Sequence, residues 1–366
     1  MCDKFSVKSR MGSYEVSFVD DFAPVLGRYR SEEPFLIVDK GVMRFYGDRI
    51  KSFFPENRIF TVEAAERHKT VEYCYSVIKT LVRNNVRKNS FIIAIGGGII
   101  QDITAFVSSI LFRGVKWIFF PTTLLAQADS CIGSKSSINM GKFKNLLGTF
   151  YPPENIFIDI NFLDTLPADA VKSGVGEMLH FYFIAGSKLA GKMMGGYGEF
   201  VSSPRLLRKY ISASLRIKKS FVEIDEFDKD KRNILNYGHT FGHAIETVSG
   251  YRINHGQAVT MGMDIANYIS LKSGRINALV FKSMHKILLG NMPRFTIGSG
   301  NIGNYLSALS KDKKNAGKSL ACILTRGPGS MYKARLSPGK KLARMILGYF
   351  NAVKGAQSKP GRIRGK

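Results

Sequence analysis

The sequence predicts an α/β N-terminal nucleotide-binding domain with a parallel sheet, followed by an all-α domain. Short apolar runs alternate with stretches of helical spacing over the first 165 residues, which is typical of parallel βαβ units. From about residue 169 onward, the strand pattern nearly disappears and helical spacing dominates. We therefore expect domains at 1–165 and 166–350, with a basic flexible tail at 351–366.

The expected elements follow in order along the chain. Four apolar runs predict buried strands at 35–39, 90–95, 116–120 and 155–159. Helices are expected at 70–86 and, after a triple glycine, at about 102–112. In the second domain, helical stretches are expected at 169–190, 203–225, 232–248, 256–272, 278–289 and 340–350.

Composition excludes several classes of protein. The 366 residues are 45% hydrophobic and 22% charged, unlike a disordered or collagen-like chain. No apolar run approaches the roughly 18 residues of a membrane span, and MCDKFSVKSR is not a secretory signal. The four cysteines lie far apart without CxxC spacing, which argues against a disulfide scaffold or a cysteine zinc site. We expect a cytoplasmic protein with no membrane partner.

The net charge of +26 is concentrated toward the C-terminus. Residues 301–366 hold 15 Lys and Arg and one acid, so +14 lies in this segment. A solvated tail explains this charge, and weak attraction to nucleic acid or anionic membrane is the alternative. Because no aromatic–basic interleaving accompanies it, we expect no specific nucleic-acid partner. Excess Lys and Arg in a folded domain equally suits an enzyme that handles phosphates and carboxylates.

Two segments that follow predicted strands are typical of nucleotide-binding turns. Gly96-Gly97-Gly98 precedes a helix, where glycines let the backbone approach a pyrophosphate at the helix N-terminus. Pro121-Thr122-Thr123 follows the next strand, at the edge of a parallel sheet where nucleotides bind. Neither is a GxGxxG motif, and a tight turn without a ligand explains each about equally well.

Three of the six histidines fall within 17 residues. His239 and His243 are four residues apart on one helical face, and His255 begins the next helix. With Glu177, which follows two glycines in an apolar helix, they suit a metal site. Structural histidines and a surface glutamate are the alternatives. The glycines before His239 and His243 favour the metal, because small neighbours leave room for a ligand.

Seven motifs come in one order along the chain. They are GGGIIQDITAF, FRGVKWIFFPTTLLAQADSCIGSKSSIN, KNLLGTFYPP, FLDTLP, GVGE, LNYGHTFGHAIE and NHGQAVTMG. Their order and spacing, over roughly residues 36–324, resemble the 3-dehydroquinate synthase family of sugar phosphate cyclases. The resemblance implies a nucleotide-binding α/β domain, a helical metal-binding domain and an active site in the cleft between them. It also implies a homodimer in which Arg113 reaches into the second subunit's site.

The resemblance further implies a set of ligands and their residues. A divalent metal, zinc or alternatively cobalt, would be held by Glu177, His239 and His255. NAD would be contacted by Asp39, Glu66, Lys69, Gly97, Gly98, Asp102, Thr122, Thr123, Lys144 and Thr165. A small sugar phosphate would be bound by Arg113, Asp129, Lys135, Asn145, Lys218, Arg232 and Asn236, with Lys218 and Arg232 as the carboxylate clamp. His243 would aid proton transfer, and Lys313 or Lys314 would be a late substrate lysine.

The chain departs from the family pattern at three marked positions. His180 replaces the lysine three residues after the metal glutamate, Gln101 replaces a glycine, and Ser134 stands where the family has GGK. The segment between Glu177 and Lys218 also looks shorter than usual. His180 shares a helical face with Glu177, so we expect it to act as a weaker, pH-dependent phosphate ligand. A different substrate or a tolerated change are the alternatives.

The implied reaction is redox-neutral. NAD removes a hydride, phosphate leaves by β-elimination, the hydride returns, and the opened ring recloses by an aldol reaction. We expect conversion of 3-deoxy-D-arabino-heptulosonate 7-phosphate to 3-dehydroquinate and phosphate. The alternatives are a related cyclase with another sugar phosphate, a metal-dependent polyol dehydrogenase, whose metal acid is typically aspartate, and an inactive binding protein.

Overall fold

The chain forms two compact units. The computed structural model describes residues 4–141, 143–310 and 319–357, so Lys313 and Lys314 lie outside the described residues. One unit comprises residues 1–174 and 199–232, and the other comprises residues 175–198 and 233–366. The sequence predicted that residues 166–350 form the second domain. Residues 199–232 instead join the first unit, because the apolar stripe of their long helix packs on its turns at 126–130 and 160–165.

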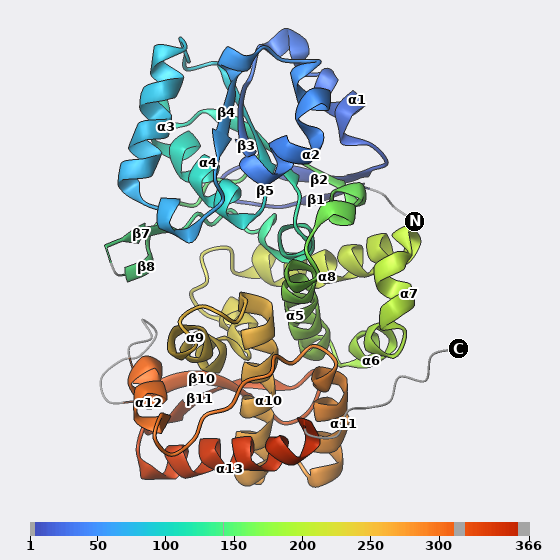
Figure 1. The fold of residues 1–366 in the computed structure, drawn as a ribbon, viewed down its shortest axis with the longest axis vertical. Coiled ribbons are helices and arrows are strands. Elements are labelled where there is room, and N and C mark those ends of the chain that lie inside the picture. Colours follow the sequence, from blue (N-terminus) through green and yellow to red (C-terminus); the bar gives the residue numbers. More distant parts are fainter. Residues whose placement is uncertain (1–3, 142, 311–318, 358–366) are drawn as a thin grey trace. The chain divides into compact units, whose positions relative to one another are not determined.

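A seven-stranded sheet organises the first unit, in the order β1-β2-β9-β6-β5-β3-β4 (Figure 1). The strands are β1 Lys4–Val7, β2 Tyr14–Val19, β3 Phe35–Asp39, β4 Ile59–Val62, β5 Phe91–Gly96, β6 Lys116–Pro121 and β9 Asn155–Asp159. All pairs are parallel except β1–β2. The four predicted strands are confirmed. The sequence analysis missed β2 because its residues alternate between buried and half-buried, without a continuous apolar run.

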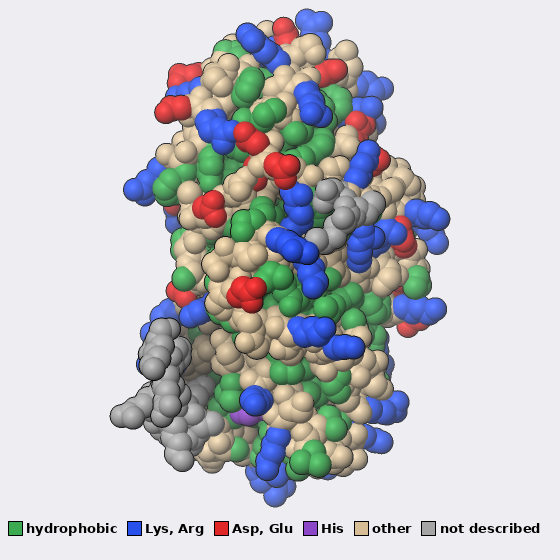
Figure 2. Space-filling view, turned by 90° about the vertical axis from the view of Figure 1, so that its right-hand side faces the viewer, with side chains coloured by type: hydrophobic (Ala, Val, Ile, Leu, Met, Phe, Trp, Pro, Cys, Tyr) green, Lys and Arg blue, Asp and Glu red, His purple; other side chains and the backbone are tan. Residues whose placement is uncertain are grey.

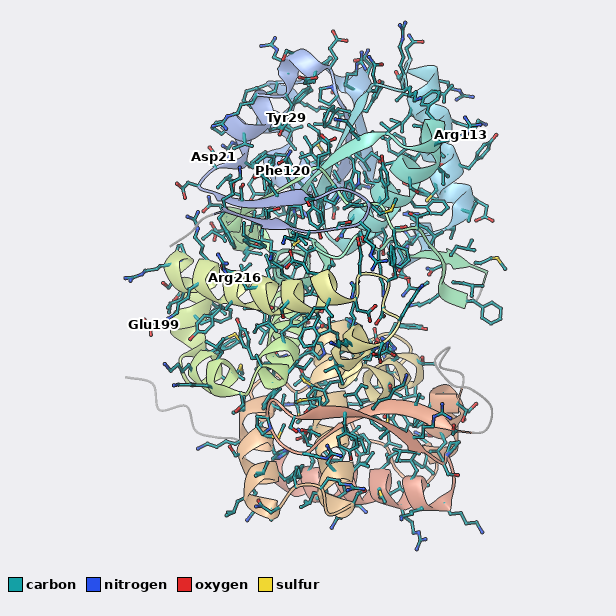
Figure 3. All side chains as sticks on the ribbon, turned by 180° about the vertical axis from the view of Figure 1, so that it is seen from behind. Asp21, Tyr29, Arg113, Phe120, Glu199 and Arg216 are labelled. Atoms are coloured by element: carbon teal, nitrogen blue, oxygen red, sulfur yellow. The ribbon has the colours of Figure 1, made fainter. Side chains whose placement is uncertain are left out.

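Helices cover both faces of this sheet. The first unit contains α1 Phe22–Gly27, α2 Lys40–Lys51, α3 Val71–Arg83, α4 Gly98–Ile110 and α8 Pro204–Ile224, of which α8 packs on the turns at 126–130 and 160–165. Helices α1 and α2 share a core with alternate residues of β3, β5 and β6, among them the buried Phe120 (Figure 3). Helix α4 packs on β3, β5 and β6, and α3 packs on α4. A small hairpin, β7 Ile138–Met140 and β8 Phe143–Leu147, extends from the same unit.

The second unit is mostly helical, as predicted. Its helices are α5 Ala168–Ile184, α6 Lys188–Gly195, α9 His239–Val248, α10 His255–Lys272, α11 Ala278–Leu289, α12 Ile302–Ser310 and α13 Lys340–Gln357. The first turns of α5 belong to the first unit, and the boundary between the two units falls within α7 Tyr197–Ser202. It also contains an antiparallel pair that the sequence did not predict, β10 Leu320–Thr325 and β11 Met331–Leu336. The domain is therefore not all-α.

Two predicted helices are interrupted at glycines. The stretch expected at 232–248 contains a short 3₁₀ turn at Lys231–Asn236 and then α9, because Gly238 adopts a left-handed φ of 83°. The stretch expected at 169–190 ends at Ile184, before Gly186 with a φ of 114°. Among the described helices, none has the length and apolarity that crossing a membrane requires. Lys and Arg side chains are spread over the face in Figure 2 rather than gathered in one patch.

Candidate metal centre and binding residues

Three helices of the second unit bring a carboxylate and two imidazoles together. Glu177 lies on α5, His239 is the first residue of α9, and His255 is the first residue of α10. Oε1 of Glu177 is 3.6 Å from Nε2 of His239 and 3.2 Å from Nε2 of His255. The three ligand atoms lie within 4.8 Å of one another, so one cation could contact all three.

Glycines allow these helices to approach so closely. A Cβ on Gly176 would collide with the carbonyl of Gly256, which joins α5 to the start of α10. A Cβ on Gly262 of α10 would collide with the backbone of Gly238 and Gly242 at α9. The glycines beside the histidines therefore serve backbone packing. This differs from the sequence interpretation, in which they leave room for a ligand.

The hydrogen bonds of the two imidazoles favour a cation between them. Nδ1 of His239 faces the carbonyl of Tyr237 at 3.4 Å, and a carbonyl can only accept, so this nitrogen carries the proton. Nδ1 of His255 faces Oε2 of Glu246 at 3.2 Å and donates to it in the same way. Nε2 of His239 is then left with a lone pair that points at the Glu177 carboxylate, and Nε2 of His255 offers one when a metal displaces its proton. Three lone pairs converging on one point suit a divalent metal.

The electrostatics keep the carboxylate ionised. Burial alone would raise the pKa of Glu177, which is 1% exposed, but the facing imidazoles of His239 and His255 hold that pKa below its usual range. Burial alone would lower the pKa of the His255 imidazole, but the carboxylates of Glu246 and Glu177 together raise that pKa above its usual value. For His239, burial dominates and its pKa falls. A charged carboxylate with a neutral His239 is the protonation state that metal binding needs.

Glu246 faces His255 at 3.2 Å and was not predicted as a site residue from the sequence. We expect Glu246→Gln to weaken zinc binding by about 10- to 100-fold, because the amide cannot replace the ionised acceptor that orients His255. Competition with a chromophoric chelator measures this affinity. Glu199→Gln, at an exposed glutamate on α7 (Figure 3), is the matched control. Equal affinity in the wild type and both variants would contradict the role of Glu246.

Two further histidines adjoin the cluster. His180 is 1% exposed, its Nδ1 is 3.7 Å from Oε2 of Glu177, and its ring lies 5.0 Å from that of His239. The predicted shared face with Glu177 is confirmed. The ring of His243 lies 5.5 Å from that of His239 and 5.7 Å from that of His255. With Glu246 and His255, His243 forms a second group of possible ligands among the described residues.

The expected nucleotide-binding residues of the first unit lie at the carboxyl ends of adjacent strands. Asp39 ends β3, Gly97 follows β5, and Thr122 follows β6. Strand order reverses between β3 and β5, where ligands bind in open α/β sheets. The carboxylate of Asp39 accepts the N–H of Gly41 at 2.8 Å and borders a cavity of about 740 Å³.

A polar network lies beside this edge. Lys69 pairs with Asp102 at 3.0 Å, and Glu66 accepts a hydrogen bond of 2.8 Å from Asn139. Burial raises the pKa of Asp102 to about 6, although the charge of Lys69 opposes this. The departure at Gln101 has a structural reason, since its side chain exchanges two hydrogen bonds of 2.6 Å with Ser130. This ties α4 to the turn at 126–130.

Four residues expected to bind the substrate cluster in the first unit. Lys218 contacts both the carboxylate of Asp129, at 2.7 Å, and its carbonyl, at 2.8 Å. Lys135 pairs with Asp228 at 2.8 Å, and Arg232 is buried. Burial lowers the pKa of Lys135, and the charges of Arg232 and Lys218 lower it further.

Five expected residues remain. Arg113 is exposed at the turn between α4 and β6, with a left-handed φ of 65° (Figure 3). Thr165 contacts Tyr46 of α2, Asn145 lies on β8 with its N–H on Asn139, and Asn236 contacts the carbonyl of Asn233. Lys144, half-buried, also lies on β8.

Fold and site together define an α/β protein with a nucleotide-binding type of sheet and a candidate Glu-His-His metal centre. Residues 59–173 match the family described as 3-dehydroquinate synthase N-terminal, and residues 174–315 match 3-dehydroquinate synthase C-terminal. The chain belongs to the 3-dehydroquinate synthase family.

Relatives by sequence agree with this assignment, and solved structures show a similar fold. The chain is 37% identical over 290 residues to a 3-dehydroquinate synthase of Clostridium tetani, which covers 78% of this chain and 77% of that protein. It is 32% identical over 355 residues to one of Alkaliphilus metalliredigens, covering 95% and 99%. The fold is similar to that of 2-deoxy-scyllo-inosose synthase complexed with carbaglucose-6-phosphate, NAD+ and Co2+, with a TM-score of 0.83, 23% identity and coverage of 94% and 99%. A probable glycerol dehydrogenase from Sinorhizobium meliloti gives a TM-score of 0.63 at 12% identity, covering 94% and 97%.

Proposed function

We propose that this chain is an NAD- and divalent-metal-dependent cyclase that converts 3-deoxy-D-arabino-heptulosonate 7-phosphate to 3-dehydroquinate and phosphate. The convergence of Glu177, His239 and His255 carries the proposal, in a chain of this family. A glutamate among the ligands also distinguishes it from polyol dehydrogenases, whose metal acid is typically aspartate. Zinc is the proposed metal, since two imidazoles and a carboxylate are typical of catalytic zinc.

The chemistry divides between bound groups and side chains. When bound, NAD supplies removal and return of a hydride, and the metal supplies Lewis-acid polarisation of the reacting oxygen. The residues at the ends of β3, β5 and β6 would hold NAD, with the open N-terminus of α4 at Gly97 receiving the pyrophosphate. His243, beside His255, would move a proton at the reacting centre.

Cationic side chains would hold the substrate. Lys218 and Arg232 would bind the carboxylate, and Asp129 and Lys135 would bind ring hydroxyls. Asn145 and Asn236 would contribute polar contacts to the phosphate and its surroundings. We further propose a cytoplasmic homodimer, in which the exposed Arg113 would complete the site of the second subunit.

Purified protein tested against a panel of sugar phosphates would decide the substrate. We expect phosphate release and 3-dehydroquinate from the heptulosonate phosphate. The departures at His180 and Ser134 favour one alternative, a cyclase for another sugar phosphate, and release of phosphate with a different carbocyclic product would show it. Accumulation of NADH without phosphate would indicate a polyol dehydrogenase.

His180 tests how closely the chain follows its family. We expect His180→Lys to keep or improve turnover of the heptulosonate phosphate, because lysine restores the family residue beside Glu177. Steady-state kinetics at saturating metal and NAD measure this. A variant that folds and binds metal but loses activity would favour a different natural substrate.

A further inference from the structure

Glu226 joins three distant segments of the first unit. It lies two residues beyond the end of α8 and is 7% exposed. Its Oε1 accepts hydrogen bonds from the hydroxyls of Ser9 at 2.6 Å and Ser134 at 2.8 Å. Its Oε2 accepts the backbone N–H of Arg10 at 2.8 Å. One buried carboxylate thus fixes the turn between β1 and β2 and the loop around Ser134.

That loop is held in a conformation that needs support. Gly133 has a φ of 114°, and Ser134, which is not a glycine, has a left-handed φ of 56°. The N–H of Gly133 donates to the hydroxyl of Tyr14 at 2.9 Å. Glycine would adopt this φ without strain. Serine is strained here, but its hydroxyl donates a hydrogen bond to Glu226 that compensates for the strain, which gives a reason for serine at this position.

Two cations of the proposed substrate site depend on the same turn. Lys135 follows Ser134 and pairs with Asp228, two residues beyond Glu226. Arg232 donates from Nη1 to the backbone carbonyl of Glu226. A Cβ on Gly133 would lie 2.6 Å from Nη2 of Arg232, so the loop packs directly on the guanidinium group.

We propose that Glu226 is a positioning residue that holds Lys135 and Arg232 in the arrangement that binds the anionic substrate, an inference that rests on the proposed function. Glu226 itself does not touch the substrate in this account. Its carboxylate orders the Gly133–Lys135 loop, and its carbonyl orients Arg232. Displacing such groups by about 1 Å can cost as much as 100-fold in efficiency.

The test compares Glu226→Gln with Glu223→Gln. Glu223 lies on α8, three residues before Glu226, and also binds the N-terminal segment by accepting the N–H of Lys8 at 2.8 Å; its other carboxylate oxygen pairs with Lys219. We expect Glu226→Gln to raise KM for the heptulosonate phosphate by about tenfold or more, with NAD affinity and metal content unchanged. Glu223→Gln should match the wild type.

Ser134→Gly removes the same hydrogen bond from the other side and suits the left-handed φ, so it should fold even if Glu226→Gln does not. We expect Ser134→Gly to raise KM less than Glu226→Gln does. In the double variant, Ser134→Gly should add little to the rise in KM caused by Glu226→Gln, because the two residues act together. If the wild type is active and Glu226→Gln has an unchanged KM, the positioning role is overturned but the proposed function is not. If only Ser134→Gly folds, an unchanged KM in that variant has the same consequence. A wild type inactive on this substrate would overturn the proposed function and this inference with it.

Discussion

His239→Ala is expected to reduce bound divalent metal from about one ion per chain to near zero. Nε2 of His239 faces the Glu177 carboxylate at 3.6 Å, and alanine removes one of the three side chains that would hold the ion. Loss of Lewis-acid catalysis worth several kcal/mol corresponds to at least about a 100-fold fall in turnover. Elemental analysis after dialysis, together with kinetics, measures both effects.

The matched control for this variant is His285→Gln. His285 of α11 also pairs with a buried carboxylate in the second unit, Asp264, at 2.7 Å, but it is not part of the Glu177 cluster. This variant should retain its metal even if its stability falls. Full metal content and activity in His239→Ala would show that the three side chains do not form the metal site.

Gly97→Val is expected to weaken NAD binding by about 100-fold or more. Gly97 caps the N-terminus of α4 without a side-chain cap, and its Cβ would lie 2.9 Å from Cγ2 of Thr123. A branched side chain would occupy the space between two turns expected to hold the cofactor, and it would keep the pyrophosphate away from the helix N–H groups. Calorimetric titration with NAD measures the change.

Ser109→Val is the control for the glycine variant. It places the same β-branched side chain on the last turns of α4, far along the helix from Gly97. NAD affinity should then be unchanged, which separates a general weakening of the helix from a blocked turn. Normal NAD binding by Gly97→Val would mean that the glycine turn is only structural.

The sequence predicted the parts of the fold whose signals are local. Strands β3, β5 and β6 are continuous apolar runs because consecutive residues on both of their faces are buried, and the short β9 has Ile156 and Ile158 buried. The short β1 and β4 and the pair β10–β11 were missed, since their pairing depends on partners elsewhere in the chain. The break before α9 was missed because a single left-handed Gly238 ends the preceding turn.

Some residues of the candidate site were predictable from local sequence signals, and others were not. Glu177, His239 and His255 came from residue type, spacing and family resemblance, and the structure brings them together. Glu246 and Glu226 were not predicted, because their roles depend on contacts with His255 and with a loop 92 residues away. Such supporting residues have no spacing of their own, and only the three-dimensional structure identifies them.

The most direct test of the account is the balance of phosphate, NAD and NADH in a single reaction. Metal-loaded protein would be supplied with the heptulosonate phosphate and much less NAD than substrate. The account predicts one phosphate released for each substrate consumed, over many turnovers, with no net accumulation of NADH, because the hydride returns to the same molecule. Phosphate release that stops at the amount of NAD supplied, or NADH that accumulates with turnover, would contradict it.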